Sequence, residues 1–211
     1  MKYIYLIRHS SPFVEIENYN DYKNVLWDEY NKNMILSVEG EEKAKKLCDI
    51  KELKNIKNIY SSNSFRAIGT AKYLSELNNT KIKLDDRINE RNLGVKYISD
   101  LPDDYIKHSF NDKNFKVYDG ETLNDVDSRF NDFIKNILKE NDKTILVIHG
   151  IILLSFLQNN CEFEYNENKI LVKHNNEVII EGNPKSPGVY KVVYNDKIKL
   201  YKSVILIKSY D

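Results

Sequence analysis

The stretch TILVI, residues 144–148, decides the fold class, because it is rich in β-branched side chains and shows no polar alternation. Tyr3–Ile7 has the same character, Ile56–Tyr60 is a further candidate strand, and Ile82–Leu84 is a weaker one. Strands of this kind are typical of parallel sheets that helices cover on both faces. The sequence therefore predicts an α/β fold: a three-layer sandwich with a mostly parallel central sheet flanked by helices, and extra β-hairpin strands at the C-terminus.

Helical patterns separate the candidate strands. Glu39–Leu53 and Ser64–Leu77 carry apolar residues at helical spacing, and Ile151–Leu157 is apolar nearly all round. The strongest pattern is Thr122–Glu140, which has one long apolar stripe and begins with a Thr-x-x-Asp sequence that resembles a capping box. We expect these four segments to cover the sheet.

Three further segments differ in character. Between residues 169 and 209, short β-like runs alternate with turn signals, which predicts hairpins added to an edge of the sheet. Residues 11–36 and 96–118 are polar, aromatic and without periodicity, and long irregular segments of this kind are often caps or lids. No change of composition divides the chain, so we expect one domain over residues 1–211.

Composition excludes several classes of protein. The 211 residues include 32 Lys and Arg against 32 Asp and Glu, and this zero formal charge argues against a nucleic-acid coat. No stretch approaches the roughly 20 apolar residues of a membrane span, and the apolar start is too short for a signal peptide. Cys48 and Cys161 form neither a disulfide framework nor a zinc knuckle. We expect a cytoplasmic protein that binds no nucleic acid, membrane or metal.

Two histidines follow two of the candidate strands. His9 follows the first apolar run with Arg8 between them, and His149 comes directly after TILVI. Ligands of open α/β sheets bind beyond the carboxyl ends of strands, so the two imidazoles could converge on one site. Arg66 falls in the first turn of a predicted helix, where free backbone N–H groups favour an anion. The alternative interpretation is that each histidine caps a strand and that Arg66 is a solvated surface residue.

Six segments between residues 3 and 150 occur in an order that resembles the histidine phosphatase superfamily, which includes the cofactor-dependent phosphoglycerate mutases. They are similar to its Arg-His-Gly signature, its LTxxGxxQA and YSSxxxRAxxTA segments, its acid segment LxERxxG, its GES helix start and its second-histidine segment VxHG. Here they read Tyr5-Leu6-Ile7-Arg8-His9-Ser10, Leu36-Ser37-Val38-Glu39-Gly40 leading to Ala44, YSSNSFRAIGTA (60–71), Ile88-Asn89-Glu90-Arg91-Asn92-Leu93-Gly94, Gly120-Glu121-Thr122 with Asp125 and Arg129, and Val147-Ile148-His149-Gly150. Each match alone is weak, whereas the ordered set is specific.

The resemblance implies roles for the matched positions. His9 would be the nucleophile that forms a phosphohistidine, and Arg8, Arg66 and His149 would bind the oxygens of the phosphoryl group. Glu90 would protonate the leaving oxygen and then help to activate water. Phosphoryl transfer mainly needs in-line positioning and cationic stabilisation, which these residues supply without a metal or other cofactor.

Two positions depart from the family pattern. Ser10 replaces the glycine that follows the nucleophilic histidine, and its hydroxyl could donate to phosphate or crowd the site. Glu15 stands where family members have an asparagine, so one phosphate contact is lost and an acidic group is gained. Both departures point to reduced activity or to an unusual substrate.

Three functions remain open from the sequence. We favour a phosphomonoester phosphatase acting on a small phosphorylated metabolite. A phosphoglycerate-mutase-type phosphotransferase is the first alternative, because Asn89-Glu90-Arg91 resembles the mutase acid segment, but the four aspartates of residues 96–118 suit a carboxylated intermediate poorly. A catalytically impaired phospholigand-binding protein is the second alternative, motivated by Ser10 and Glu15. Specificity should lie in residues 11–36 and 96–118, whose aromatic side chains could form a wall or merely pack the lid.

Overall fold

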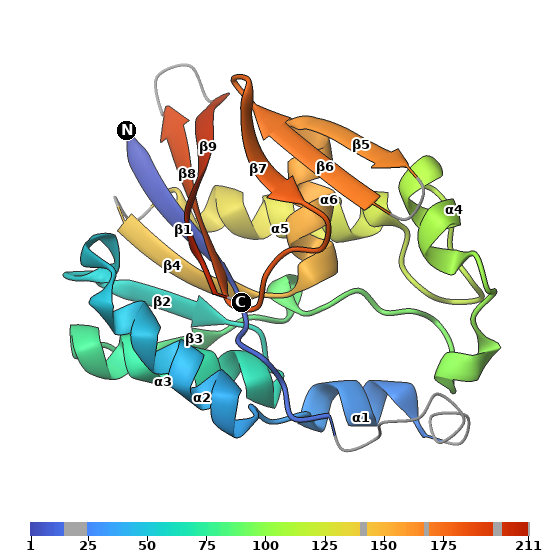
Figure 1. The fold of residues 1–211 in the computed structure, drawn as a ribbon, viewed down its shortest axis with the longest axis horizontal. Coiled ribbons are helices and arrows are strands. Elements are labelled where there is room, and N and C mark those ends of the chain that lie inside the picture. Colours follow the sequence, from blue (N-terminus) through green and yellow to red (C-terminus); the bar gives the residue numbers. More distant parts are fainter. Residues whose placement is uncertain (15–24, 140–142, 167–168, 196–199, 211) are drawn as a thin grey trace.

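The computed structural model describes residues 1–14, 25–139, 143–166, 169–195 and 200–210, and these form a six-stranded and a three-stranded sheet (Figure 1). The larger sheet has the strand order β3-β2-β4-β1-β8-β9. Its strands are β1 Lys2–Arg8, β2 Asn58–Ser61, β3 Ile82–Leu84, β4 Lys143–Ile148, β8 Gly188–Asn195 and β9 Leu200–Ser209. The first four run parallel, and the β8–β9 hairpin pairs antiparallel with β1. The mostly parallel sheet that the apolar runs predict is therefore confirmed.

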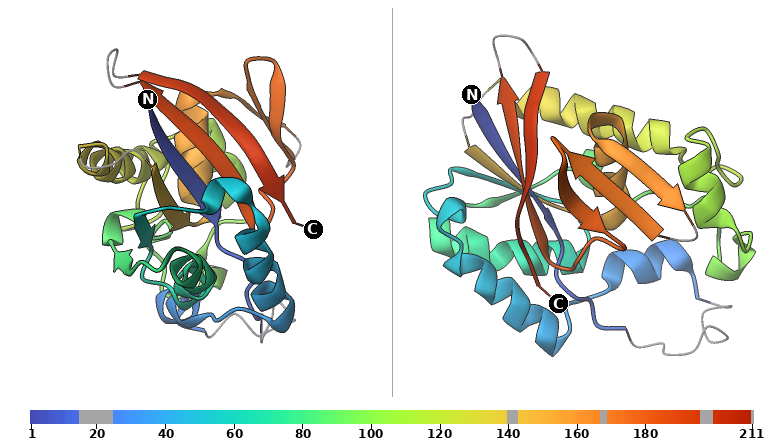
Figure 2. Two further views of the ribbon diagram at one scale, coloured as in Figure 1. Left: turned by 90° about the vertical axis from the view of Figure 1, so that its left-hand side faces the viewer. Right: turned by 45° about the horizontal axis from the view of Figure 1, so that its top comes forward.

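Helices lie on both faces of this sheet (Figures 1 and 2). On one face α3 (Phe65–Asn78) packs on the strands with α2 (Val38–Lys46) beside it, and on the other lie α5 (Leu123–Ile137) and α6 (Gly150–Asn160). Successive side chains of β1 point to opposite faces of the sheet, so this strand contributes to both hydrophobic cores. Ile4 and Leu6 pack on the α5–α6 side, whereas Tyr5 and Ile7 pack on the α3 side. This arrangement is the predicted three-layer sandwich.

Helix α5 shows how the local sequence builds a layer. The Thr122 hydroxyl accepts from the Asp125 backbone N–H at 3.0 Å, and the Asp125 carboxylate accepts from the Thr122 N–H at 2.9 Å, which completes a capping box. The apolar stripe of α5, including Phe130 and Phe133, is buried against the sheet and α6. Burial of each such aromatic ring stabilises the fold by roughly 1.5–3 kcal/mol.

The expected helix over residues 39–53 is shorter in the structure. Helix α2 ends at Lys46 and is followed by two 3-10 turns, Leu47–Asp49 and Lys51–Leu53. Ile50 between them has an extended backbone, and this break lets Leu47 and Leu53 both reach the core. A further 3-10 turn covers Asp86–Ile88.

The C-terminal region is divided between the two sheets. The β8–β9 hairpin lies at an edge of the large sheet, as predicted, whereas β6 (Lys169–His174) and β7 (Glu177–Glu181) join β5 (Glu162–Asn166) in the separate three-stranded sheet. The expectation that all of these strands extend the large sheet is therefore wrong. The smaller sheet packs its own buried side chains against the α6 side of the core, and this burial keeps it off the sheet edge.

The two segments without periodicity each contain a short helix. Helix α1 (Trp27–Asn33) lies within residues 11–36, and a 3-10 turn (Ile98–Asp100) and α4 (Tyr105–Asn111) lie within residues 96–118. An isolated antiparallel bridge joins Leu26 to Tyr97. These segments border one side of the molecule, beyond the carboxyl ends of β1 and β4 (Figure 1).

Candidate active site

Three of the predicted site residues meet where β1 and β4 end. His9 follows β1, His149 follows β4, and Arg66 is the second residue of α3. The two imidazole rings lie 5.1 Å apart between centroids, and their residues are 5% and 1% exposed, with Arg66 at 4%. The backbone N–H of His9 also donates to the Ile148 carbonyl at 2.9 Å, which extends the β1–β4 pairing to the site.

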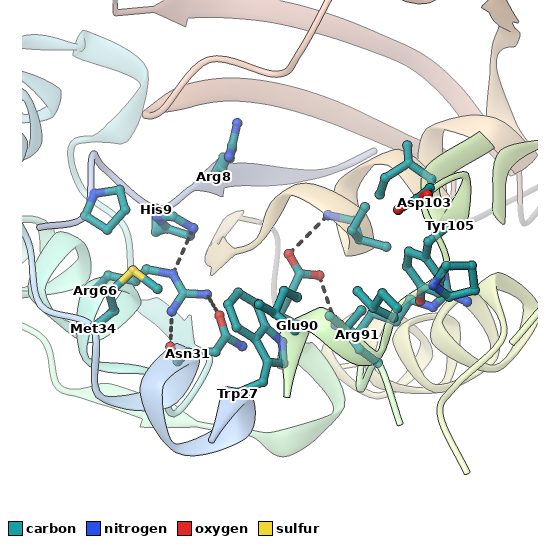
Figure 3. A pocket seen from close by; sticks show the side chains of 17 residues that line it. Arg8, His9, Trp27, Asn31, Met34, Arg66, Glu90, Arg91, Asp103 and Tyr105 are labelled. Atoms are coloured by element: carbon teal, nitrogen blue, oxygen red, sulfur yellow. Dashed lines mark hydrogen bonds between the residues drawn. The ribbon is translucent and has the colours of Figure 1, made fainter. Parts of the chain in front are cut away.

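Arg66 connects the two histidines. Its Nε donates to His9 Nε2 at 3.0 Å (Figure 3), and its Nη2 donates to His149 Nδ1, also at 3.0 Å. The same guanidinium donates to Asn31 in α1, through Nη2 to Oδ1 at 2.8 Å and through Nη1 to the backbone carbonyl. Burial lowers the pKa of Arg66 to about 10, so the group is still a cation at neutral pH. A charged, rigid fork is thereby held beside both imidazoles.

The Arg66 contacts assign the tautomer of each histidine, because a guanidinium can only donate. His9 accepts at Nε2, so its proton lies on Nδ1 and is donated to the Ser10 carbonyl at 2.8 Å. His149 accepts at Nδ1, so its Nε2 proton is donated to the Ser62 hydroxyl at 2.6 Å. Burial first, and the positive charge of Arg66 second, hold the pKa of both histidines well below the usual value. Both rings are therefore neutral, with the His9 Nε2 lone pair directed at Arg66.

Glu90 lies on the floor of the same cavity, after the 3-10 turn Asp86–Ile88. One carboxylate oxygen accepts from the Arg91 N–H at 2.9 Å and the other from the Ile151 N–H at 3.2 Å (Figure 3). Ile151 is in the first turn of α6, where the helix dipole favours a negative charge. Two backbone donors thus fix the carboxylate in one orientation.

Two arginines fix the segment that carries Glu90. Arg91 is 2% exposed and donates to the carbonyl oxygens of Glu121 and Phe115 and to the Ser109 hydroxyl at 2.8–2.9 Å. Arg129 forms a bidentate ion pair with the Glu121 carboxylate, at 2.6 and 3.0 Å. The Gly120-Glu121-Thr122 segment that the sequence analysis singled out therefore supports the acid segment and does not line the cavity.

Arg8 lines the cavity, but one of its donors is used elsewhere. Its Nη1 donates to the Pro184 carbonyl, while its Nε is buried and has no hydrogen-bond partner in the described part of the chain. Burial lowers the pKa of Arg8 from its ordinary value. In Figure 3 its side chain is directed away from Arg66, so the two guanidinium groups do not form one clamp in this structure.

Ser10 is the predicted phosphate contact that the structure does not bring to the cavity. Its side chain is fully buried, its hydroxyl donates to the Gly40 carbonyl at 2.7 Å, and its backbone N–H donates to Thr70 Oγ1 at 2.9 Å. Its φ is not positive, so a side chain fits there without backbone strain. Ser10 thus neither reaches the cavity nor crowds it. Glu15, the second departure, lies outside the described residues.

His149 does not line the cavity itself, because Arg66 lies between it and the open space. The structure also adds two residues that the sequence analysis missed as site residues, Asn31 and Ser62. Asn31 lies in a segment without any periodicity, so no sequence signal indicated its contact with Arg66. Ser62 lies in the quoted segment 60–71, and its hydrogen bond to the second histidine could have been suspected from that motif alone.

The cavity in front of these residues has a volume of about 680 Å³. Its lining combines the charged floor with apolar side chains from α1, α4 and the turn Ile98–Asp100, as seen for Trp27 and Met34 in Figure 3. Within the described ranges no group of three or more His, Cys, Asp or Glu side chains is placed to hold a metal ion. No described helix has the length and apolar character needed to span a bilayer.

Comparison with known proteins fits this geometry. The family model of the histidine phosphatase superfamily (branch 1) matches residues 4–189. The chain belongs to this superfamily. The match covers every residue of the candidate site, from Arg8 to His149.

Solved structures of this fold resemble the chain over nearly its whole length. Mycobacterial glucosyl-3-phosphoglycerate phosphatase in complex with VO3 has a TM-score of 0.70 at 16% identity, with 99% of this chain and 98% of that chain covered. YhfR from Bacillus stearothermophilus has a TM-score of 0.69 at 18% identity, with 100% and 98% covered. No curated protein matches the chain. At these identities the structural likeness shows the fold alone.

Proposed function

We propose that this histidine phosphatase superfamily member is a phosphomonoester phosphatase that works through a phosphohistidine on His9. The observation that carries the proposal is the position of Arg66, whose guanidinium contacts the neutral Nε2 of His9 and the Nδ1 of His149 at 3.0 Å each. A nucleophilic lone pair and the donors for phosphoryl oxygens are thus held side by side. A mycobacterial phosphatase of the same fold is known in complex with inorganic phosphate, which supports the same ligand class here.

In the first chemical step, the His9 Nε2 lone pair forms a bond to phosphorus and the bond from phosphorus to the alcohol oxygen breaks. The Nδ1 proton stays on the ring, and its hydrogen bond to the Ser10 carbonyl stabilises the positive charge that the imidazole acquires. Glu90 enters this step as the carboxylic acid, gives its proton to the leaving oxygen, which departs as the alcohol, and is left as the carboxylate. Arg66 exchanges its contacts with His9 and Asn31 for contacts with phosphoryl oxygens, and Arg8 adds the donors left free.

In the second step, water attacks the phosphohistidine. Glu90 takes the proton of that water, the bond from phosphorus to His9 breaks, and inorganic phosphate leaves while His9 returns to its neutral form. In this scheme His149 acts chiefly by orienting Arg66, since it contacts the guanidinium and not the cavity. No metal or other cofactor enters either step.

Hydrolysis is favoured over mutase chemistry by the charge of the cavity wall. A mutase must retain a doubly charged intermediate, and the wall opposite the floor carries the Asp103 carboxylate. The binding-protein alternative rests on Ser10 and Glu15; the Ser10 hydroxyl is turned away from the cavity, and Glu15 lies outside the described residues. We also propose a cytoplasmic location, which suits the two free cysteines.

A substrate panel tests the proposal. We expect the protein to release inorganic phosphate from several phosphomonoesters and to form no isomerised product from 3-phosphoglycerate. His9→Ala should lose turnover by about 10³-fold or more, the order seen when a covalent nucleophile is removed, while its melting temperature shows that it folds. Turnover by His9→Ala at the parent rate would show that His9 is not the nucleophile. Phosphate-protected melting of the parent without turnover on any substrate would favour a binding protein.

A further inference from the structure

The cavity is chemically divided into a charged end and an apolar end. The lining contains the polar groups of Arg8, His9, Arg66 and Glu90 and, beside them, a set of apolar side chains. We call this apolar set the apolar wall. It consists of Trp27, Met34, Leu93, Ile98, Leu101 and Ile106. An apolar surface of this kind gains free energy only when it covers an apolar group, so it bears on the alcohol part of a substrate.

The apolar wall is continuous although it comes from distant parts of the sequence. The backbone N–H of Trp27 donates to the Lys96 carbonyl at 3.0 Å, and the Leu26–Tyr97 bridge lies next to this hydrogen bond. Helix α4 is in turn tied to the floor, because the buried Arg91 donates to the Ser109 hydroxyl at 2.8 Å. The wall is therefore held at a fixed place relative to Glu90.

In the described part of the cavity lining, positive charge either lies beside His9 or is buried within the protein. Of the described lining residues, Arg8, Arg66 and Arg91 carry positive charge. Arg91 is 2% exposed and donates from each of its three nitrogens to protein groups, which ties its guanidinium to the protein around the acid segment. Arg8 and Arg66 are the donors beside His9. The charged residue on the wall side is Asp103, an exposed carboxylate.

We propose that the preferred substrates are phosphomonoesters of apolar alcohols, large enough to reach the apolar wall and without a second negative charge. The inference rests on the proposed function and names its substrate class. A second phosphate or a carboxylate would find no free cation on the described wall and would lie near the Asp103 carboxylate. A phosphomonoester of a small alcohol would leave the apolar wall uncovered.

Matched substrates separate size from charge while the leaving group stays an alkyl alcohol. We expect kcat/KM for 2-naphthylmethyl phosphate to exceed that for ethyl phosphate by at least about 10- to 200-fold, the range that hydrophobic pockets give for a few carbon atoms. Adding a carboxylate to the naphthalene ring, as in 6-carboxy-2-naphthylmethyl phosphate, should lower kcat/KM about tenfold or more. Equal kcat/KM values across the three esters would overturn the inference and leave the proposed function intact.

Wall variants locate the effect. Ile106→Ala removes a 46% exposed side chain of the wall, and we expect the ratio of naphthylmethyl to ethyl ester to fall several-fold. The matched control is Val178→Ala, a 53% exposed side chain on β7 outside the cavity, which should leave that ratio unchanged. An equal fall in both variants, or in neither, would contradict the placement of the alcohol on the wall.

Asp103→Asn tests the charge separately. It should raise kcat/KM for the carboxylated ester about two- to fivefold at low ionic strength and much less in about 0.5 M salt, because exposed charges are screened. It should change the uncharged ester little. If no ester is hydrolysed at all, the proposed function fails, and calorimetric binding of 2-naphthylmethylphosphonate against ethylphosphonate still decides the inference. Tighter binding of the naphthyl compound would support it, and equal binding would overturn it.

Discussion

The floor and the apolar wall of the cavity differ in how the chain fixes them. On the floor, His9 follows a strand, Arg66 begins a helix and Glu90 follows a 3-10 turn. Each is held by hydrogen bonds to its neighbours, and His149 lies behind Arg66. The wall comes from α1 and the residue after it, from Leu93 and from residues 96–118, and its side chains are half-buried or exposed. In the proposed function, the floor carries chemistry that any phosphomonoester can use, whereas the wall contacts the part that differs between substrates.

This difference predicts which residues should tolerate substitution. Floor residues share partners, so the loss of one disturbs the others. Wall residues share only an apolar surface, so their substitution should alter substrate preference with little effect on the reaction itself. Four predictions test this contrast, and they are given in order from the largest expected effect to the smallest.

Of these four, the largest effect is expected for Arg66→Ala. It removes the donors for the phosphoryl oxygens and the contacts to both histidines, so kcat/KM should fall about 10²- to 10³-fold on every phosphomonoester. Arg66→Lys keeps the charge without the fork and should recover only part of this loss. Steady-state kinetics on the naphthylmethyl and ethyl esters measure both variants. A loss of kcat/KM on only one of the two esters would show that Arg66 affects substrate preference, as a wall residue would, and not the reaction common to both.

Glu90→Gln should cost less and should depend on the leaving group. A general acid contributes most when the departing oxygen is strongly basic, so we expect about a 10²-fold loss with alkyl esters and a much smaller one with aryl phosphates. The measurement is kcat for the phosphorylation step on a series of esters, and the readout is the slope of its logarithm against the basicity of the leaving oxygen. Equal losses on both classes would remove Glu90 from the role of proton donor.

Gly40→Ala should disturb the floor from outside it. A methyl group there would lie 2.0 Å from the Ser11 carbonyl oxygen, which is backbone two residues from His9. We therefore expect a loss of about 1–3 kcal/mol in unfolding free energy together with reduced turnover. Gly69→Ala is the matched helix control, because its methyl would meet only the flexible Leu36 side chain, at 3.2 Å. Thermal melting of the pair checks this. Equal stability of the two variants would show that the close approach at Gly40 costs nothing.

The smallest effect concerns stability against pH. Burial and Arg66 hold the pKa of His149 well below its usual value of about 6.5. Below that pH the unfolded chain binds a proton that the folded chain does not, so folding stability falls as the pH drops below about 6.5 and is independent of this group above it. His149→Asn should make the slope shallower by about 1 kcal/mol per pH unit just below this value. Denaturant melts between pH 5 and 8 give both slopes, and parallel curves would contradict the buried neutral imidazole.

The sequence predicted more of the floor than of the wall. Apolar runs ended by His9 and His149 indicated a shared edge of the sheet, and the structure brings these two rings within 5.1 Å of each other. Asn31 could not be predicted, since its contact with Arg66 joins segments 35 residues apart and leaves no local pattern. Strand β5 was also missed, because its own composition does not indicate a strand and only its pairing with β6 makes it one.

The sequence by itself determined the layered fold, its superfamily resemblance and the strand-end position of the two histidines. The layered fold and the strand-end positions follow from periodicity and capping, which act between near neighbours along the chain, whereas the resemblance rests on the six ordered motifs. The tertiary structure decided that the Ser10 hydroxyl turns to Gly40, that Arg66 separates His149 from the cavity, and that an apolar wall faces the floor. Such features depend on which distant segments meet, and packing of the whole chain alone fixes that.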